Sequence, residues 1–393
     1  MSKLLALICT ILLSCIGAVA ADLESDRERQ PGLSALVAQG RYLAQIGVCA
    51  ACHTPAAVPS GKPQSLDQSL DPSLNITQLR ANPNWTAYLD KNKALAGGVP
   101  FIIRLPGGAN GTAVTRNITP DLQTGIGAWS AADIARALKY GVRPNGEALF
   151  IFPPHVFYKN MSDYDAYALA AYLKSIPPVK NRIKARSLPF PVAPIPPSTV
   201  SRLSYPPMGA TIERGKYLTS ALVGCVECHS HRLADGALHE WAGGHPDSKT
   251  TGMFRLGPDL PLTQDEKGIA AWPYPGYAAL ISPNLSVFGP GGPEERASPD
   301  ALKRAIREGI PVPDSRDQRR RSGSLSYTMP WQFYADMSED DVSAIVKYMK
   351  TVPYRHGYHG PRLIYFGDDW KRAFRFHYGE EPSFIDELTF GKR

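Results

Sequence analysis

Long hydrophobic runs and alternating strand patterns are both scarce in this chain of 393 residues. The hydrophobic fraction of 43% is ordinary, which excludes a disordered chain and a multi-span membrane protein. The lack of alternating patterns leaves helices and loops as the main structure. With 36 prolines and 34 glycines, the chain favours compact domains with much loop. The net charge is +7, but no pattern of aromatic and basic residues indicates a nucleic-acid partner.

The first 20 residues have the features of a secretory signal. Lys3 precedes a short apolar stretch at residues 4–13, and Ala18-Val19-Ala20 is typical of a cleavage site. We therefore expect an exported, periplasmic protein with residues 1–20 removed. Two alternatives stay open, namely a retained anchor helix and cleavage before Cys15. In the second case a lipid on Cys15 would tether the protein to a membrane.

Only four of the six cysteines lie beyond this segment, and exported proteins normally use such cysteines in disulfides. Here they form two C-x-x-C-H patterns, made by Cys49, Cys52 and His53 and by Cys225, Cys228 and His229. This pattern attaches haem c through two thioethers, and the histidine binds the iron. Zinc or a redox dithiol are weaker alternatives, because the pairs lie 176 residues apart and no βαβ pattern surrounds them. The sequence thus predicts two covalently bound haems.

Further motifs repeat at a similar offset. Gly-Arg-Tyr-Leu at residues 40–43 recurs as Gly-Lys-Tyr-Leu at residues 215–218, and Met161-Ser162-Asp163 recurs 176 residues later as Met337-Ser338-Glu339. The chain is therefore predicted to be a tandem duplication with one haem domain per copy. We place the domains at residues 32–180 and 208–355, with a proline-rich linker at 181–207 and an extension at 356–393.

Helical periodicity and capping residues support an all-α fold. Apolar residues recur at helical spacing in residues 33–46 and 211–223, directly before the two cysteine pairs. Four serines have the sequence context of helix N-caps, namely Ser130, Ser162, Ser298 and Ser338. Prolines at 177, 178 and 353 end the helices that begin at Ser162 and Ser338.

Asn-Ile-Thr-Pro-Asp at residues 117–121 and Met329-Pro330-Trp331 complete a family pattern. Over residues 32–353 the chain resembles class I cytochromes c in tandem. More specifically, it resembles the cytochrome c subunits of periplasmic alcohol, aldehyde and gluconate dehydrogenases. Many of those subunits have three haems, whereas this chain has two C-x-x-C-H motifs. The resemblance implies an all-α fold of two cytochrome c domains that carry electrons.

The resemblance also implies the sixth iron ligands. In the family, this ligand is the methionine of Met-Pro, eight residues before the Met-Ser motif, which is Met329 in the second copy. The same count in the first copy reaches Pro153, which cannot bind iron. Our hypothesis is that His155 binds the first haem instead, which would give that haem the lower potential. A surface histidine and an open sixth position remain the alternatives.

Two classes of function follow. The first is an electron-transfer protein, acting between a dehydrogenase and a downstream cytochrome or oxidase, with no catalytic residues of its own. The second is a dihaem enzyme, such as a peroxidase or small-molecule oxidoreductase, with a labile first haem. His231 is expected to face solvent, and a metal site with His239 and His245 is the alternative. We expect the tail after Pro353 to pack over the second domain, with a docking surface for a partner as the alternative.

Overall fold

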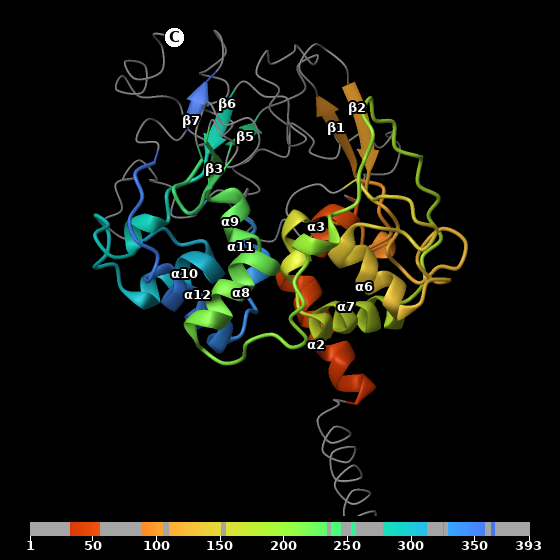
Figure 1. Cartoon of the computed structure of the whole chain (residues 1–393), viewed down its shortest axis with the longest axis horizontal. Coiled ribbons are helices and arrows are strands. Elements are labelled where there is room, and N and C mark those ends of the chain that lie inside the picture. Colours follow the sequence, from red (N-terminus) through yellow and green to blue (C-terminus); the bar gives the residue numbers. More distant parts are fainter. Residues whose placement is uncertain are drawn as a thin grey trace, which may run out of the picture.

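Two pairs of crossing helices dominate the computed structural model (Figure 1). The structure describes residues 32–55, 89–104, 110–150, 155–233, 237–244, 253–256, 278–312, 325, 329–357 and 363–365. Outside them lie the proposed signal segment with Cys15, His245 and most of the C-terminal extension. The backbone of His155 is described, but its side chain is not.

The first helix pair consists of α2 (Leu33–Ile46) and α7 (Asp163–Ser175). They approach closely because Gly40 has no side chain, and a Cβ there would lie 1.8 Å from the carbonyl oxygen of Ala168. Helix α6 (Ala131–Tyr140) packs on α7, and α3 (Cys49–His53) follows α2. The predicted caps are confirmed, since Ser130 forms a capping box with Asp133 and the Ser162 side chain caps α7.

The second helix pair repeats this arrangement. Helix α8 (Ile212–Ala221) crosses α12 (Glu339–Met349), and a Cβ on Gly215 would lie 2.0 Å from the carbonyl oxygen of Ala344. Three further helices complete this part: α9 (Cys225–Cys228), α10 (Pro299–Glu308) and α11 (Trp331–Tyr334). Ser298 and Ser338 are N-caps as predicted, and Pro299 occupies the first turn of α10. We call the two parts the first half and the second half.

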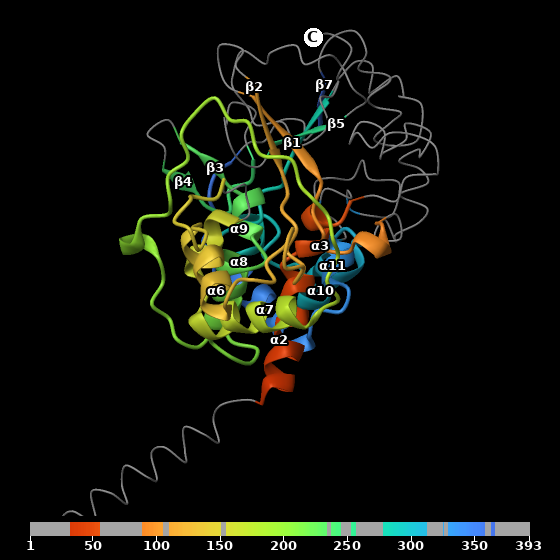
Figure 2. The same cartoon turned by 90° about the vertical axis from the view of Figure 1, so that its right-hand side faces the viewer.

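Short strands accompany the helices at the end of the molecule opposite the start of α2 (Figures 1 and 2). They form two antiparallel hairpins, β1 (Pro100–Arg104) with β2 (Asn110–Val114) and β3 (His231–Arg232) with β4 (Leu238–His239). A third antiparallel sheet has the order β5 (Met253–Leu256), β6 (Ala278–Ile281), β7 (Leu363–Tyr365). The chain is therefore mainly helical, as expected. Strand β7 also brings part of the tail against the second half, as predicted.

Residues 176–207, which connect the halves, run in an extended conformation interrupted by the 3-10 turn η4 (Pro197–Thr199). This segment is bonded to the first half along its length. Ser187 exchanges backbone hydrogen bonds with Thr112, and the Ile195 amide donates to the carbonyl of Tyr140. Within the described ranges, the other 3-10 turns are η2 (Lys91–Lys93), η3 (His155–Asn160) and η5 (Ser286–Phe288).

One continuous hydrophobic core joins the halves. It contains Leu43 and Ile46 from α2 together with Leu218 and Leu222 from the second half, all essentially inaccessible to solvent. Burial of each such side chain stabilises the fold by about 1.5–3 kcal/mol. The core thus extends directly beneath both cysteine pairs. None of the helices in the described residues combines the length and the apolar character needed to cross a bilayer.

Candidate functional site: two C-x-x-C-H segments

Both cysteine segments begin at a residue with left-handed backbone conformation. Helix α3 starts after Val48, which has a φ of 59°, and α9 starts after Gly224, which has a φ of 72°. This conformation breaks the preceding helix and redirects the chain into a new short one. Glycine adopts it readily, whereas a β-branched residue such as Val48 is strained in it. The first half therefore holds its segment in a strained backbone that the second half avoids.

The four thiols are half-buried, and none of them forms a disulfide. Within each segment the two cysteines are three residues apart on one helical turn, so they lie on the same face. Burial raises the pKa of Cys49, Cys225 and Cys228 to about 12 and that of Cys52 to about 11. Each segment therefore presents two neighbouring protonated thiols, the donor set that two vinyl groups of one porphyrin require.

The histidine of each segment is fixed by one backbone carbonyl. Nδ1 of His53 lies 2.8 Å from the carbonyl oxygen of Arg116, and Nδ1 of His229 lies 2.9 Å from that of Pro283. A carbonyl only accepts, so Nδ1 carries the proton and Nε2 carries the lone pair that binds a metal. Burial also lowers the pKa of His53, which favours the neutral ring. Such an outer hydrogen bond orients histidines that bind metals.

A side-chain turn supports each of these carbonyls. In the first half, Asn117 Oδ1 accepts from the amide of Thr119 at 3.0 Å and from its hydroxyl at 2.7 Å. In the second half, Asn284 Oδ1 accepts from the amide of Ser286 at 2.9 Å and from its hydroxyl at 2.6 Å. Each asparagine directly follows the residue whose carbonyl holds the histidine. The turn therefore fixes the carbonyl that selects the histidine tautomer.

The turn at residues 284–286 was not predicted from the sequence. The first copy reads Asn-Ile-Thr and the second reads Asn-Leu-Ser, at an offset of 167 residues instead of 176. An alignment that allows a gap and accepts any Asn-apolar-hydroxyl triplet would have found it. The carbonyls of the two histidines themselves accept from Gly97 at 2.7 Å and Gly243 at 2.9 Å, a further repeated contact.

The two predicted sixth ligands lie at similar but not equivalent positions, since Met329 is eight residues before Met337 and His155 is six residues before Met161. Met329 is half-buried, packs against the common core and precedes α11. His155 begins η3, which precedes α7 as α11 precedes α12. The side chain of His155 lies outside the described residues, so its binding to iron remains a prediction.

The prediction that His231 faces solvent is wrong. Its side chain is buried, and Nδ1 lies 2.8 Å from the carbonyl oxygen of Gly243. Its ring meets that of His239 edge to face, with the ring centres 5.0 Å apart. The hairpin of β3 and β4 turns this side chain inward. Within the described parts of the chain, no group of three or more His, Cys, Asp or Glu residues could hold a metal ion.

Two C-x-x-C-H turns with anchored imidazoles are the arrangement found in c-type cytochromes. No family model matches the chain. It is 26% identical over 339 residues to the gluconate 2-dehydrogenase cytochrome c subunit of Pantoea cypripedii. The matched region covers 81% of this chain and 60% of that protein. The chain is 33% identical over 213 residues to a nicotinate dehydrogenase subunit of Pseudomonas putida. This matched region covers 52% of this chain and 15% of that protein.

A third relative is a diheme cytochrome c-type protein of Cereibacter sphaeroides, 30% identical over 157 residues, which cover 37% of this chain and 52% of that protein. The chain thus spans 60% or less of the length of these relatives. Cytochrome c subunits of alcohol and fructose dehydrogenases are also similar to it. The resemblance to cytochrome c subunits of dehydrogenases is therefore confirmed.

Proposed function

We propose that this chain is a dihaem c-type cytochrome that transfers electrons in the periplasm, between a dehydrogenase and a downstream cytochrome or oxidase. The observation that carries the proposal is the repeated site. In each copy, two cysteines that form no disulfide are followed directly by a histidine whose imidazole carries its proton on Nδ1. A bound haem would supply a reversible one-electron change at iron.

In this proposal the residues divide into three roles. The thiols of Cys49, Cys52, Cys225 and Cys228 hold the two haems covalently, and His53 and His229 bind iron through Nε2. The carbonyls of Arg116 and Pro283 keep the Nδ1 proton in place, which holds each ring in one orientation. Each haem would belong to one domain, at residues 32–180 and 208–355.

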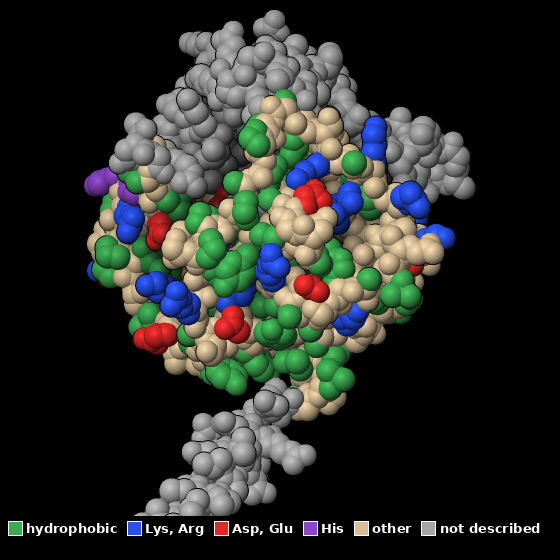
Figure 3. Space-filling model, turned by 45° about the vertical axis from the view of Figure 1, so that its right-hand side comes forward, with side chains coloured by type: hydrophobic (Ala, Val, Ile, Leu, Met, Phe, Trp, Pro, Cys, Tyr) green, Lys and Arg blue, Asp and Glu red, His purple; other side chains and the backbone are tan. Residues whose placement is uncertain are grey.

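The proposed partner is a dehydrogenase, because several relatives are named as cytochrome subunits of such enzymes. The proposed signal at residues 1–20 supports a periplasmic location, and a lipid on Cys15 would add a membrane tether. On the face drawn in Figure 3, basic and acidic side chains are interspersed.

We further propose Met329 as the sixth ligand of the second haem and His155 as that of the first. A thioether ligand raises the potential of haem iron, whereas a second imidazole gives a lower one. Six-coordinate haems suit electron transfer because little moves when the iron changes its charge.

A potentiometric titration followed by absorption spectra tests this function. We expect two low-spin haem c signals that change in separate one-electron steps. His155→Ala should change the signal at lower potential, and Met329→Ala the one at higher potential. A protein without haem absorbance would contradict the proposal, and an unchanged low-spin spectrum in His155→Ala would remove that residue as a ligand.

The second candidate function is a dihaem enzyme, and the observation that favours it is Pro153 at the expected ligand position of the first copy. Carbon monoxide added to the reduced, unmodified protein separates the two functions. Rapid binding at one haem would favour the enzyme, and no binding would favour the electron carrier.

A further inference from the structure

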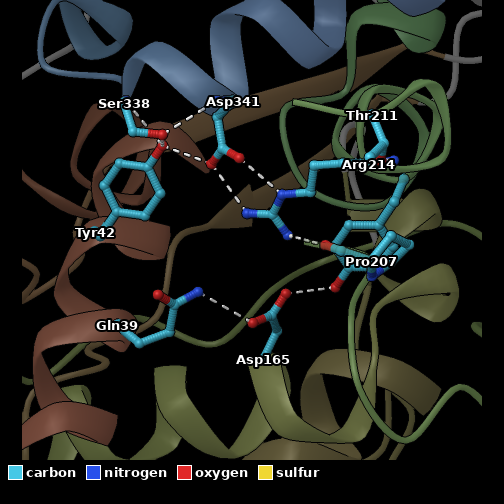
Figure 4. A network of polar contacts seen from close by, with 9 residues as sticks. Gln39, Tyr42, Asp165, Pro207, Thr211, Arg214, Ser338 and Asp341 are labelled. Atoms are coloured by element: carbon cyan, nitrogen blue, oxygen red, sulfur yellow. Dashed lines mark hydrogen bonds and ion pairs between the residues drawn. The ribbon is translucent and has the colours of Figure 1, made fainter. Parts of the chain in front are cut away.

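In each half, one tyrosine forms a hydrogen bond with an aspartate of the other half, and Figure 4 shows the pair of Tyr42 and Asp341. The Tyr42 hydroxyl, on α2, donates to Asp341 Oδ2 on α12 at 2.7 Å. The Tyr217 hydroxyl, on α8, donates to Asp165 Oδ2 on α7 at 2.6 Å. The two tyrosines occupy the same place in the repeated Gly-x-Tyr-Leu motif, and each aspartate lies four residues after the methionine of Met-Ser. The contact is therefore reciprocal.

The same hydroxyls also accept hydrogen bonds. The amide of Ser338 donates to Tyr42 at 3.2 Å, and the amide of Ser162 donates to Tyr217 at 3.1 Å. These serines are the N-caps of α12 and α7, so each tyrosine completes the first turn of a helix in the opposite half. Burial raises the pKa of Tyr42 to about 12, so its hydroxyl stays protonated and keeps donating.

A second reciprocal contact lies nearer the cysteines. Gln45 Nε2 on α2 donates to Asp336 Oδ2 at 3.0 Å, and Asn160 Nδ2 donates to the carbonyl of Ser220 on α8 at 2.9 Å. Correspondingly, α11 of the second half packs on α2, and η3 of the first half packs on α8. The interface therefore has an approximate twofold relation.

The interface extends to the start of both cysteine segments. A Cβ on Gly47, two residues before Cys49, would lie 3.5 Å from Cδ1 of Leu222, three residues before Cys225. The Tyr158 hydroxyl donates to the carbonyl of Gly47 at 3.0 Å, which holds the backbone of Gly47 in place at this contact. Helices α3 and α9 lie at the same level beside the interface in both views (Figures 1 and 2).

We infer that this reciprocal interface holds the two halves together without the connecting segment, and that Tyr42 and Tyr217 are positioning residues for electron exchange between the two sites. The exchange part rests on the proposed function, whereas the association part does not. Electron tunnelling weakens steeply with distance, so two sites exchange electrons rapidly only if their separation is held short and constant. Paired hydrogen bonds to charged carboxylates provide such a constraint.

Cleavage of the full chain at the boundary between the halves tests the association. Gly209 is suited to an inserted protease site, because its φ is 71° and a Cβ there would meet nothing within 4 Å. After cleavage we expect the two fragments to elute together in size-exclusion chromatography at low concentration. Elution as two separate fragments would overturn the association.

The double variant Tyr42→Phe with Tyr217→Phe keeps both rings and removes both hydroxyls. In the cleaved protein we expect it to weaken the association by about 10- to 150-fold per hydroxyl, the usual effect of losing a hydrogen bond to a charged group. Tyr205→Phe is the matched control, since Tyr205 is an exposed tyrosine at 62% accessibility. Equal affinities for the double variant and the control would contradict the role of the two hydroxyls.

Electron exchange is measured on the uncleaved holoprotein. One haem is reduced rapidly, and the reduction of the other haem is followed over time by its absorbance. We expect slower exchange in the double variant with unchanged haem spectra, and an unchanged rate in Tyr205→Phe. An unmodified rate in the double variant would overturn the positioning role. A protein without haem would instead refute the proposed function, while the elution of the cleaved fragments would still decide the association.

Discussion

The two halves share one plan but treat their buried carboxylates differently. In the second half, Arg214 contacts Asp341 twice, with Nε 2.8 Å from Oδ1 and Nη2 2.9 Å from Oδ2. The residue that precedes the helix-crossing glycine in the first half is Gln39, and its Nε2 lies 3.3 Å from Asp165 Oδ1. Burial raises the pKa of Asp165. A symmetric interface can thus contain one ion pair and one carboxylate whose hydrogen-bond partners are neutral.

The largest effect expected from a change in one half is the loss of one haem. Cys49→Ala with Cys52→Ala should remove the first haem, and Cys225→Ala with Cys228→Ala the second, because each pair supplies both covalent links. Haem absorbance per protein, measured after denaturation, should fall by half in either variant. Loss of both haems from one pair of substitutions would show that the sites do not form independently.

Replacing the two buried carboxylates should lower the stability of the protein by different amounts in the two halves. Asp341→Asn leaves the Arg214 guanidinium buried without its counter-ion, which costs about 3–5 kcal/mol. Asp165→Asn keeps a hydrogen-bonding group next to Gln39 and Tyr217 and should cost about 1 kcal/mol. Chemical unfolding of the holoprotein measures both. Equal losses would refute the difference between the ion pair and its neutral counterpart.

The glycines at the helix crossings should behave alike in both halves. Gly40→Ala and Gly215→Ala each place a methyl group against a backbone carbonyl, which should destabilise the fold by about 1–3 kcal/mol. In an open helix, alanine would instead stabilise by up to about 1 kcal/mol. Gly32→Ala is the control, since a Cβ there would meet only Ser34 Oγ, at 3.9 Å. Thermal unfolding that is unchanged in either variant would show that the two helices of that half cross less closely than the structure places them.

The smallest effect concerns pH. Because the pKa of Asp165 is raised above its ordinary value of 3.8, there is an acidic pH range just above 3.8 in which the folded protein keeps a proton that the unfolded chain releases. This stabilisation is complete below pH 3.8 and is lost as the pH rises through the folded pKa. The unfolding free energy of the unmodified protein should therefore fall, relative to Asp165→Asn, as the pH rises above 3.8. If the unfolding free energies of the two proteins changed in parallel with pH, the proposed contribution of Asp165 would be contradicted.

Local signals were enough to predict the helices and their caps. Ser130 and Ser298 were recognised because a cap depends on residues within one turn, and the structure places both where expected. The cysteine motif was also readable, since one helical turn fixes its geometry. The same locality explains why residues 33–46 were predicted with their observed limits.

Contacts between the halves could not be predicted in this way. Tyr42 and Asp341 lie 299 residues apart, and neither has a local feature that indicates its partner. His231 was misplaced because its burial depends on a hairpin whose strands have two residues each, too short for an alternating pattern. The carbonyl contacts of His53 and His229 likewise involve distant residues.

The mass of the purified, intact protein tests the central claim most directly. Two haems bound through Cys49, Cys52, Cys225 and Cys228 should add two haem increments that persist after denaturation, and proteolysis should yield one haem peptide containing His53 and another containing His229. A mass without these increments, or disulfides at the four cysteines, would contradict the account.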